Sequence, residues 1–410
     1  MLSDPIPSPS FPRCACPSAL RVLDVTEWFG DTTGGVRRYL LEKARYVARH
    51  PGLSQVLVVP GPRSAVSDEM GSRCYRLQGP AIPTQAPYRI LYQARAVDRI
   101  VARERPDIIE VGSPWAAPWI ALRSARHARI PAVWFYHGNF PTALRPPAGA
   151  SALSVRARDV ATHAAWWYVR QIGRRFARTL VASESTARDL ERAGVERVVR
   201  VPLGVDLETF HPRRRAAAAT TRRSFGLPDA PAPVVAFVGR FVVEKELELL
   251  VDAWPAIARE TGATLLLVGA GPREAALRHR MARLGGARVI WRPFESDRER
   301  IADLLAAADL YVAPGSTETF GLAPLEALAS GTPVVSADRG GVAEQVLRSG
   351  AGAVFAAGDA SDLARVVIAQ LSRGDRAAVA RQGRTYAERE HGWDMVFDRL
   401  FDVYREVLAA

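Results

Sequence analysis

Short runs of apolar residues recur along the whole chain, and segments with helical periodicity separate most of them. The runs lie at 21–25, 55–59, 107–111, 132–136, 179–183 and 198–202 in the first half, and at 234–239, 264–269, 288–291, 309–314, 333–337 and 352–355 in the second. Brief apolar runs that alternate with amphipathic segments are typical of parallel strands covered by helices on both faces. The pattern therefore predicts an α/β protein with two doubly wound, Rossmann-like sheets.

A change of composition between the two series marks the division into domains. Residues 206–233 contain three consecutive arginines, four alanines and a proline-rich end, and we expect them to form a linker. The predicted organisation is a flexible lead at 1–19, a first domain at 20–205, the linker, a second domain at 234–385, and a helix at 386–410 that packs back on the first domain. Two facing sheets imply a cleft, which is where α/β proteins bind ligands.

Composition excludes several classes of protein. Of the 410 residues, 48% are hydrophobic and 24% charged, and no apolar run is long enough to span a bilayer. The lead is rich in Pro and Ser and does not resemble a secretory signal. Among the three cysteines, Cys14 and Cys16 have no further ligands at metal-like spacing, so neither a disulfide framework nor a metal site is expected. We expect a cytoplasmic chain.

The charge of the chain is strongly positive and almost entirely due to arginine. The formal net charge is +12, and only Lys43 and Lys245 among the 55 basic residues are lysines. Such a surface attracts anions, which include phosphorylated substrates, lipid headgroups and nucleic acids. Charge alone does not choose between them.

Two strand ends carry features suited to phosphate. Gly34 and Gly35 follow the first strand and precede a helical segment, an arrangement that fits either a phosphate-binding helix N-terminus or a simple tight turn. Arg240 and Lys245 follow the strand that opens the second domain. Two cations beside a strand end can neutralise a diphosphate, and they can equally be solvated surface charges.

The segment APGSTETFGLAPLEALASGTPVV, residues 313–335, holds two glutamates eight positions apart. We expect Glu318 to precede a helix and Glu326 to lie inside it, with the amides of 319–322 forming the helix N-terminus. An acid and base pair of a glycosidase is disfavoured, because eight helical residues would separate the two backbones by roughly 12 Å. A helix cap with a solvated glutamate remains the alternative on spacing alone.

Together these segments resemble the retaining glycosyltransferases of family 4, which have the GT-B fold. The run from Glu318 to Glu326 is similar to that family's E-x7-E motif, Gly239, Arg240 and Lys245 to its G-R-x4-K diphosphate clamp, and Gly34 and Gly35 to its first glycine loop. The likeness extends from about residue 20 to 408. Glu246 and Gly138 depart from the usual pattern, in which a small residue follows the lysine and a polar residue follows the histidine.

The resemblance implies a role for each matching residue. Arg240 and Lys245 would hold the donor diphosphate, Glu326 the ribose hydroxyls, and His137 would lie near the transferred sugar. The donor sugar itself would be bound by Glu318 and by the segment Thr319, Phe320, Gly321 and Leu322. No metal or other cofactor is required, and the nucleotide-diphosphate sugar is a co-substrate.

The resemblance further implies hexosyl transfer with retention of anomeric configuration. The segments FYHGNFP and VPLGVDLETFHP look like those of bacterial mannosyltransferases, which favours GDP-mannose over UDP-glucose as donor. A sugar-nucleotide epimerase or hydrolase on the same fold is a second class. A nucleic-acid-binding protein is a third, but it would leave the glutamate pair unexplained and no recognisable module for it is present.

Two arginine rows bear on the acceptor. Arg170, Arg174, Arg175 and Arg178 follow Trp166, Trp167 and Tyr168, and Arg95, Arg99 and Arg103 recur at four-residue intervals. A basic and aromatic helix face can lie on an anionic membrane, or it can be a solvated face whose aromatics enter the core. The expected acceptor is a lipid-linked or carbohydrate hydroxyl, with peripheral membrane contact on the cytosolic face.

Overall fold

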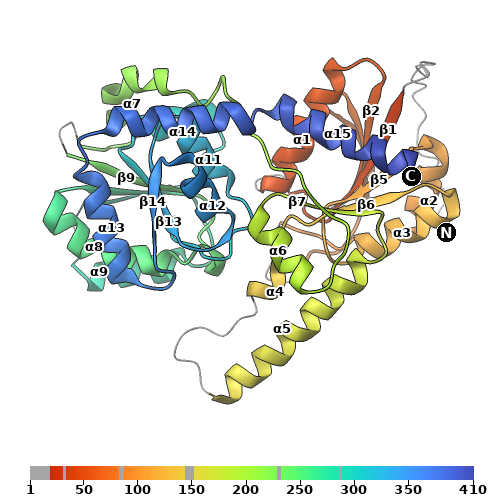
Figure 1. Cartoon of the computed structure of the whole chain (residues 1–410), viewed down its shortest axis with the longest axis horizontal. Helices are drawn as coiled ribbons and strands as arrows, with labels where there is room; N and C mark the ends of the chain where they lie inside the picture. Colours follow the sequence, from red (N-terminus) through yellow and green to blue (C-terminus); the bar gives the residue numbers. More distant parts are fainter. Residues whose placement is uncertain (1–18, 31–33, 83–86, 144–151, 229–231, 286–287) are drawn as a thin grey trace.

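A computed structural model describes residues 19–410, except 31–33, 83–86, 144–151, 229–231 and 286–287. The N-terminal lead with Cys14 and Cys16 falls outside the described residues, apart from Ala19. The chain forms two α/β lobes side by side, and the C-terminal helices run along both of them (Figure 1). All twelve apolar runs form strands, with ends within two residues of those expected.

The first lobe is an eight-stranded sheet in the order β3-β4-β2-β1-β5-β6-β7-β8. Its strands are β1 (Leu20–Val25), β2 (Leu53–Gly61), β3 (Ala65–Glu69), β4 (Ser72–Gln78), β5 (Ile108–Val111), β6 (Ala132–Phe135), β7 (Arg178–Val181) and β8 (Val198–Arg200). Its helices are α1 (Gly35–Arg49), α2 (Ala94–Glu104), α3 (Ala117–Ala128), α4 (Phe140–Ala143), α5 (Ala152–Gly173) and α6 (Glu184–Arg192). All strand pairs are parallel except β3 with β4.

The edge hairpin β3–β4 was not expected from the sequence. Its two central turn residues are Met70 (φ 57°) and Gly71 (φ 87°), both in the left-handed region. Hairpin turns of this type usually have Asn, Asp or Gly at the first central position, so the methionine there gave no indication of a turn. Strand β3 is also largely exposed and lacks a continuous apolar run.

The second lobe is a six-stranded parallel sheet in the order β11-β10-β9-β12-β13-β14. Its strands are β9 (Val234–Val238), β10 (Thr264–Val268), β11 (Val289–Arg292), β12 (Leu310–Ala313), β13 (Val334–Ala337) and β14 (Gly352–Phe355). Its helices are η2 (Val243–Lys245), α8 (Leu247–Thr261), α9 (Glu274–Arg283), α10 (Arg298–Ala307), α11 (Leu322–Ala329), α12 (Gly340–Ser349) and α13 (Ala360–Leu371). This is the 3-2-1-4-5-6 order of a nucleotide-binding sheet, in which ligands bind where the strand order reverses.

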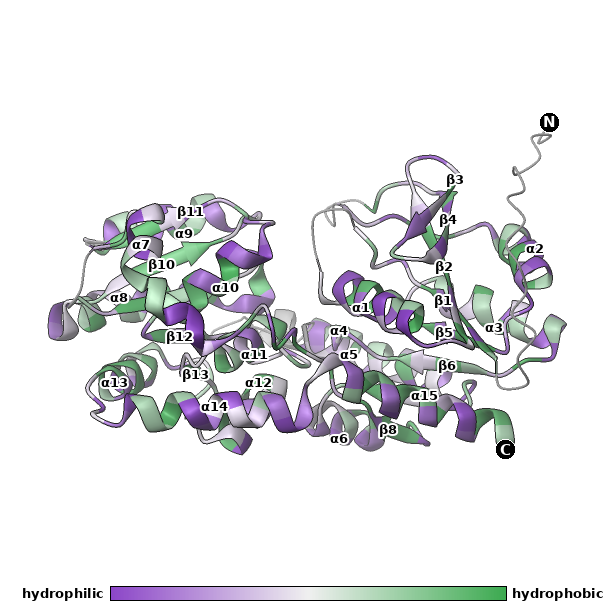
Figure 2. Cartoon of the chain, turned by 90° about the horizontal axis from the view of Figure 1, so that it is seen from above, coloured by the Kyte–Doolittle hydropathy of each residue, from purple (hydrophilic) through white to green (hydrophobic). Residues whose placement is uncertain are grey.

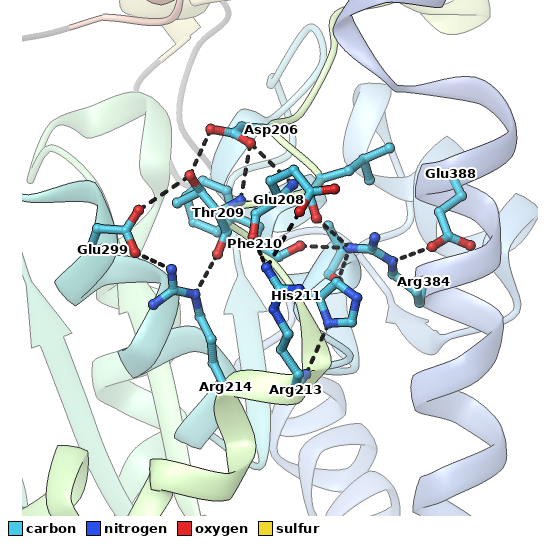
Figure 3. Close-up of polar contacts among 12 residues, drawn as sticks. Asp206, Glu208, Thr209, Phe210, His211, Arg213, Arg214, Glu299, Arg384 and Glu388 are labelled. Atoms are coloured by element: carbon cyan, nitrogen blue, oxygen red, sulfur yellow. Dashed lines mark hydrogen bonds and ion pairs between the residues drawn. The ribbon is translucent and has the colours of Figure 1, made fainter.

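Residues 206–233, which composition predicted to be the linker, include helices that belong to the second lobe, so the domain boundary drawn at 233 is corrected. They contain η1 (Pro212–Ala217) and α7 (Ala218–Ser224). Figure 3 shows the contact of Arg214 with Glu299 on α10. Arg214 also donates to Asp303 on the same helix at 2.7 Å, and the two contacts fix this segment to the second lobe. Of the three consecutive arginines, Arg214 and Arg215 pair with carboxylates of that lobe, whereas Arg213 pairs with Glu208 within the segment itself.

The predicted boundary at 385 falls inside α14 (Arg376–Glu390), so it too is corrected. The chain returns to the first lobe at His391 and Gly392 and continues as α15 (Trp393–Ala409). The outward and return crossings lie side by side, because Val205 donates its backbone N–H to the His391 carbonyl at 2.7 Å. Arg384 of α14 also donates to the carbonyls of Leu207 and Phe210 at 3.0 and 2.7 Å (Figure 3).

The terminal helix is joined to the first lobe by a buried polar cluster. Lys43 on α1 is fully buried and lies 2.7 Å from Asp24 on β1 and 3.5 Å from Glu110 on β5. It also donates to the Tyr404 hydroxyl of α15 at 2.7 Å. Burial raises the pKa of Glu110 to about 7, although Lys43 acts in the opposite direction. Figure 2 shows strand β10 of the second lobe as hydrophobic.

Candidate functional site

Four loops at the carboxyl ends of strands face one another across the two lobes. In the second lobe they follow β9 and β12, the neighbouring strands at which the strand order reverses. In the first lobe they follow β1 and β6. The residues expected to bind substrates lie on these four loops and on the first turns of α1 and α11.

The two loops of the second lobe are in direct contact. A Cβ added at Gly315 would lie 2.5 Å from the carbonyl oxygen of Glu244, so only glycine allows this approach. Lys245 Nζ then forms an ion pair with the carboxylate of Glu318. Both side chains remain about one quarter exposed, at 28% and 25%. The predicted diphosphate ligand Lys245 and the predicted sugar ligand Glu318 are thus adjacent.

Arg240 lies at the junction of the lobes. Its guanidinium is 6.0 Å from the ring centre of Tyr88, a residue of the first lobe. The Tyr88 hydroxyl would in turn lie 3.2 Å from a Cβ at Gly34, whose φ of 112° favours glycine. Tyr88 therefore connects two residues that the sequence singled out, although nothing in the sequence drew attention to Tyr88 itself.

A glycine and the side chain of Gln345 fix the backbone of the turn that precedes α11. Gly321 has a φ of 89° and precedes the first helical residue, Leu322. Gln345 of α12 donates to the Phe320 carbonyl at 2.7 Å, which fixes the turn. The first amides of a helix have no acceptor within it and can bind anionic or hydroxyl oxygens. The Phe320 side chain itself is buried, so only its backbone can face a ligand.

Glu326 forms an ion pair with Arg298, a residue that the sequence analysis did not single out. Arg298, the first residue of α10, donates to Glu326 Oε1 at 3.1 Å. Burial raises the pKa of Glu326, against the opposing effects of Arg298 and of Arg38 on α1. Because nearly every cation in this chain is arginine, composition gave no reason to select Arg298. Glu318 and Glu326 therefore contact different partners, Lys245 and Arg298.

His137 follows β6 with its ring stacked on Phe135, the ring centres being 4.1 Å apart. Its Nε2 is buried without a hydrogen-bond partner among the described residues. Burial, and then the charge of Lys43, lowers the pKa of His137 to about 3. The imidazole is therefore neutral near pH 7. Gly138 departs from the usual pattern because a Cβ there would lie 2.8 Å from the Trp28 ring.

Two close approaches join the first lobe to residues 319–322, at the start of α11. The Thr319 hydroxyl donates to the His137 carbonyl oxygen at 2.7 Å. A Cβ at Gly35 would lie 3.3 Å from Leu322 Cδ1. The second unusual position, Glu246, has a φ of 48° and accepts a hydrogen bond from Ser316 at 2.7 Å. The structure thus brings residues predicted from both halves of the chain to one place.

Comparison with known proteins identifies the family. A profile of family 4 glycosyltransferases matches residues 33–209, and one of group 1 glycosyl transferases matches residues 232–373. A GDP-mannose-dependent α-(1-6)-phosphatidylinositol dimannoside mannosyltransferase of Mycobacterium tuberculosis is 33% identical over 330 residues, covering 77% of this chain and 79% of that protein. The chain belongs to glycosyltransferase family 4. It is a hexosyltransferase.

Other relatives of this glycosyltransferase span nearly its whole length. A GDP-mannose-dependent α-mannosyltransferase of M. tuberculosis is 28% identical over 401 residues, or 95% of this chain and 97% of that protein. Among solved structures, a sucrose-phosphate synthase of Thermosynechococcus elongatus has a TM-score of 0.77 at 22% identity, with 95% and 99% of the two chains covered. This structural likeness confirms the GT-B fold.

Neither a metal centre nor a membrane span is seen in the part of the glycosyltransferase that the structure describes. No group of three His, Cys, Asp or Glu side chains within it is arranged to hold a metal ion. No helix in the same residues is long and apolar enough to cross a membrane.

Proposed function

We propose that this glycosyltransferase moves a mannosyl group from GDP-mannose to a hydroxyl of a lipid-linked or carbohydrate acceptor, with retention of configuration. The observation that carries the proposal is the ion pair between Lys245 and Glu318. It supports the proposal because a cation suited to a diphosphate lies next to a carboxylate suited to sugar hydroxyls. The choice of GDP-mannose is supported by relatives named as GDP-mannose-dependent mannosyltransferases.

The donor would lie along the loops of the second lobe. Lys245 and Arg240 would bind the diphosphate, and the backbone amides of Phe320, Gly321 and Leu322 at the start of α11 would donate hydrogen bonds to its remaining oxygens. Glu318, released from Lys245 once phosphate is bound, would accept hydroxyls of the sugar. Glu326, held by Arg298, would accept the ribose hydroxyls.

Catalysis would be electrostatic. Departure of the sugar leaves negative charge on the diphosphate, and cations already fixed by the protein lower the energy of that state. Among the carboxylates of the first lobe, Glu110 belongs to the buried Lys43 cluster and Glu27 accepts bonds from Ser113 and Ala116. Neither is free to act as a covalent nucleophile. We therefore propose front-face transfer, in which a leaving phosphate oxygen takes the acceptor proton.

Neutral His137 would bind the sugar rather than carry charge. Because the pKa of His137 is about 3, its Nε2 can exchange a hydrogen bond with a hydroxyl without forming an imidazolium. Gly34 and Gly35 would leave room for the reacting groups between α1 and α11.

We also propose that the acceptor is reached at an anionic membrane surface, with no nucleic acid as partner. On α5, Trp167 is 63% and Val160 71% exposed, and on α2 the row Arg95, Arg99 and Arg103 is exposed. Trp166 and Tyr168 instead pack against the core, and Arg178 lies in β7 rather than on the helix. Of the three consecutive aromatic residues, Trp166 and Tyr168 thus face the core and Trp167 faces the surface.

The test is thermal unfolding of the purified protein with GDP, UDP, ADP and their sugars. A nucleotide at 100 times its Kd should stabilise the fold by about 2.7 kcal/mol. We expect a shift with GDP that is lost in Lys245→Ala and kept in the control Arg389→Ala, an exposed arginine on α14. A shift with UDP alone would replace mannose by glucose as the favoured sugar, and no shift with any nucleotide would overturn the donor site.

A further inference from the structure

A second concave site lies in the first lobe, at the opposite end of the sheet from the transfer site. It has a volume of about 380 Å³ and is bounded by the C-terminal half of α3, the turn after α5, and the starts of β6 and β7. The transfer site lies instead beyond the carboxyl end of β6, where His137 stands. A cavity of this size is in the range that holds small organic ligands.

Four exposed arginines surround this cavity: Arg126, Arg174, Arg175 and Arg197. None of them is paired with an Asp or Glu within the described part of the chain, whereas nearby Arg123 lies 2.7 Å from Asp98. Their hydrogen-bond partners within the described residues are neutral. Arg126 donates to the Leu122 carbonyl and Arg197 to the Arg174 carbonyl, at 3.2 and 3.3 Å.

Backbone carbonyls orient the guanidinium groups of Arg126, Arg175 and Arg197 without neutralising them. Four like charges around one cavity repel each other unless an anion binds between them. The planar fork of arginine matches phosphate oxygens in pairs, and arginine is the usual residue where phosphate is recognised. The cavity lining also includes apolar side chains of Leu122, Ile130 and Phe176, which suit the uncharged part of a phosphate ester.

Exposed apolar side chains lead to the cavity along α5. Val160, Trp167 and Arg174 are spaced seven residues apart, so they lie in one row along the helix axis. The row continues past the helix end because Arg174 still donates its N–H to the Arg170 carbonyl at 3.1 Å. Beside it, Arg175 lies 5.3 Å from the ring of Trp119, which is 38% exposed. Figure 1 shows α5 extending away from the sheet.

We propose that this four-arginine cavity binds the phosphate of an anionic lipid headgroup, while the exposed row on α5 enters the interfacial region of the membrane. Apolar and aromatic side chains combined with arginine suit this boundary, where hydrocarbon meets charged headgroups. The inference rests on the proposed membrane contact, but not on the chemistry of transfer. The site holds the enzyme on the membrane and leaves the cleft free for the acceptor.

The test compares two double variants that remove the same charge. Arg126→Gln with Arg174→Gln alters the cavity, and Arg381→Gln with Arg389→Gln removes two exposed arginines of α14. Sedimentation with vesicles of phosphatidylglycerol and phosphatidylcholine should show at least tenfold weaker binding for the cavity variant and less than a twofold change for the control. Vesicles of phosphatidylcholine alone should not bind the wild type.

Several results would overturn the proposal. Equal losses in both double variants would mean that net charge alone drives adsorption. Absence of wild-type binding, or protection by soluble glycerol phosphate without vesicle binding, would exclude the lipid as source of the phosphate. The GDP-induced thermal shift is measured on the same proteins and should be unchanged in the cavity variant. A missing GDP shift in the wild type would count against the transfer function and not against this cavity.

Discussion

The hydroxyl of Thr319 donates a hydrogen bond to the carbonyl oxygen of His137 at 2.7 Å, and so joins the loop that precedes α11 to the strand end of the other lobe. Thr319 lies next to Glu318, which pairs with Lys245. A change in the relative position of the lobes therefore acts directly on the residues proposed to hold the donor sugar. We therefore expect this contact to couple the relative position of the lobes to the geometry of transfer.

Replacing Thr319 by valine keeps the shape of the side chain and removes this bond. A hydrogen bond of this kind contributes about 1 kcal/mol, so we expect kcat for mannosyl transfer to fall roughly fivefold. The Kd for GDP should change less than twofold, because nucleotide binding needs only the second lobe. Steady-state kinetics and calorimetry separate the two quantities. Thr385→Val, on the exposed side of α14, is the control. Equal losses in GDP affinity and kcat would contradict the coupling.

The pair Lys245 and Glu318 is expected to respond asymmetrically to substitution. Lys245→Ala removes a charge-assisted contact to phosphate and should weaken GDP binding by about 10- to 100-fold. Glu318→Gln frees the lysine, so GDP should bind as tightly as before or more tightly, while transfer falls. Titration calorimetry with GDP and a transfer assay measure both. If Glu318→Gln weakened GDP as much as Lys245→Ala, the glutamate would belong to the nucleotide site instead.

The alternation of apolar runs predicted both sheets because a parallel strand that is buried on both faces needs apolar residues at consecutive positions. It missed β3 because that edge strand is exposed, and β4 because its sequence, SRCYRLQ, mixes polar and apolar residues although most of it is buried. The turn between them, which begins with Met70, gave no further signal. Composition predicted a linker at 206–233, since sequence alone does not reveal that Arg214 contacts carboxylates on α10.

The candidate site was only partly visible in the sequence for a similar reason. Local motifs placed Glu318, Lys245 and His137 on strand ends, and the fold brought those ends together. Arg298 and Tyr88 were missed because their roles arise from long-range contacts, one with Glu326 and one with Arg240. Whether the predicted residues bind substrate stays a prediction that the variants above test.

The buried cluster around Lys43 should be sensitive to any unpaired charge. Lys43→Met leaves Asp24 and Glu110 without their cation, and we expect unfolding to become easier by about 3–5 kcal/mol. Adding Asp24→Asn to Lys43→Met should recover a large part of the lost stability, because it removes the buried negative charge of Asp24 that had no cation left. Urea unfolding measures both effects, and exposed Arg381→Met should change stability by less than about 0.5 kcal/mol. A double variant no more stable than Lys43→Met would show that packing, not charge, dominates.

The return crossing at His391 predicts loss of stability in mild acid. The His391 ring is fully buried, and its Nδ1 donates to the Leu203 carbonyl at 2.9 Å. Burial lowers the pKa of His391 to about 4, whereas an unfolded histidine has a pKa of about 6.5. As the pH falls below 6.5, His391 binds a proton in the unfolded chain but stays neutral in the folded chain. The free energy of unfolding therefore declines until about pH 4.

The expected size of this effect follows from the shift in pKa. Each unit corresponds to 1.36 kcal/mol, so His391 accounts for a decline of roughly 3 kcal/mol between pH 6.5 and 4. His391→Gln can still donate to the Leu203 carbonyl and does not titrate, so its urea-unfolding free energy should depend less steeply on pH over this range. Tyr386→Phe, whose ring centre lies 4.8 Å from that of His391, is the control. It should shift stability by the same amount at every pH, because the phenol does not ionise in acid. If His391→Gln kept the wild-type slope, the acid sensitivity would reside in other groups, of which His137, with its pKa of about 3, is the first to test.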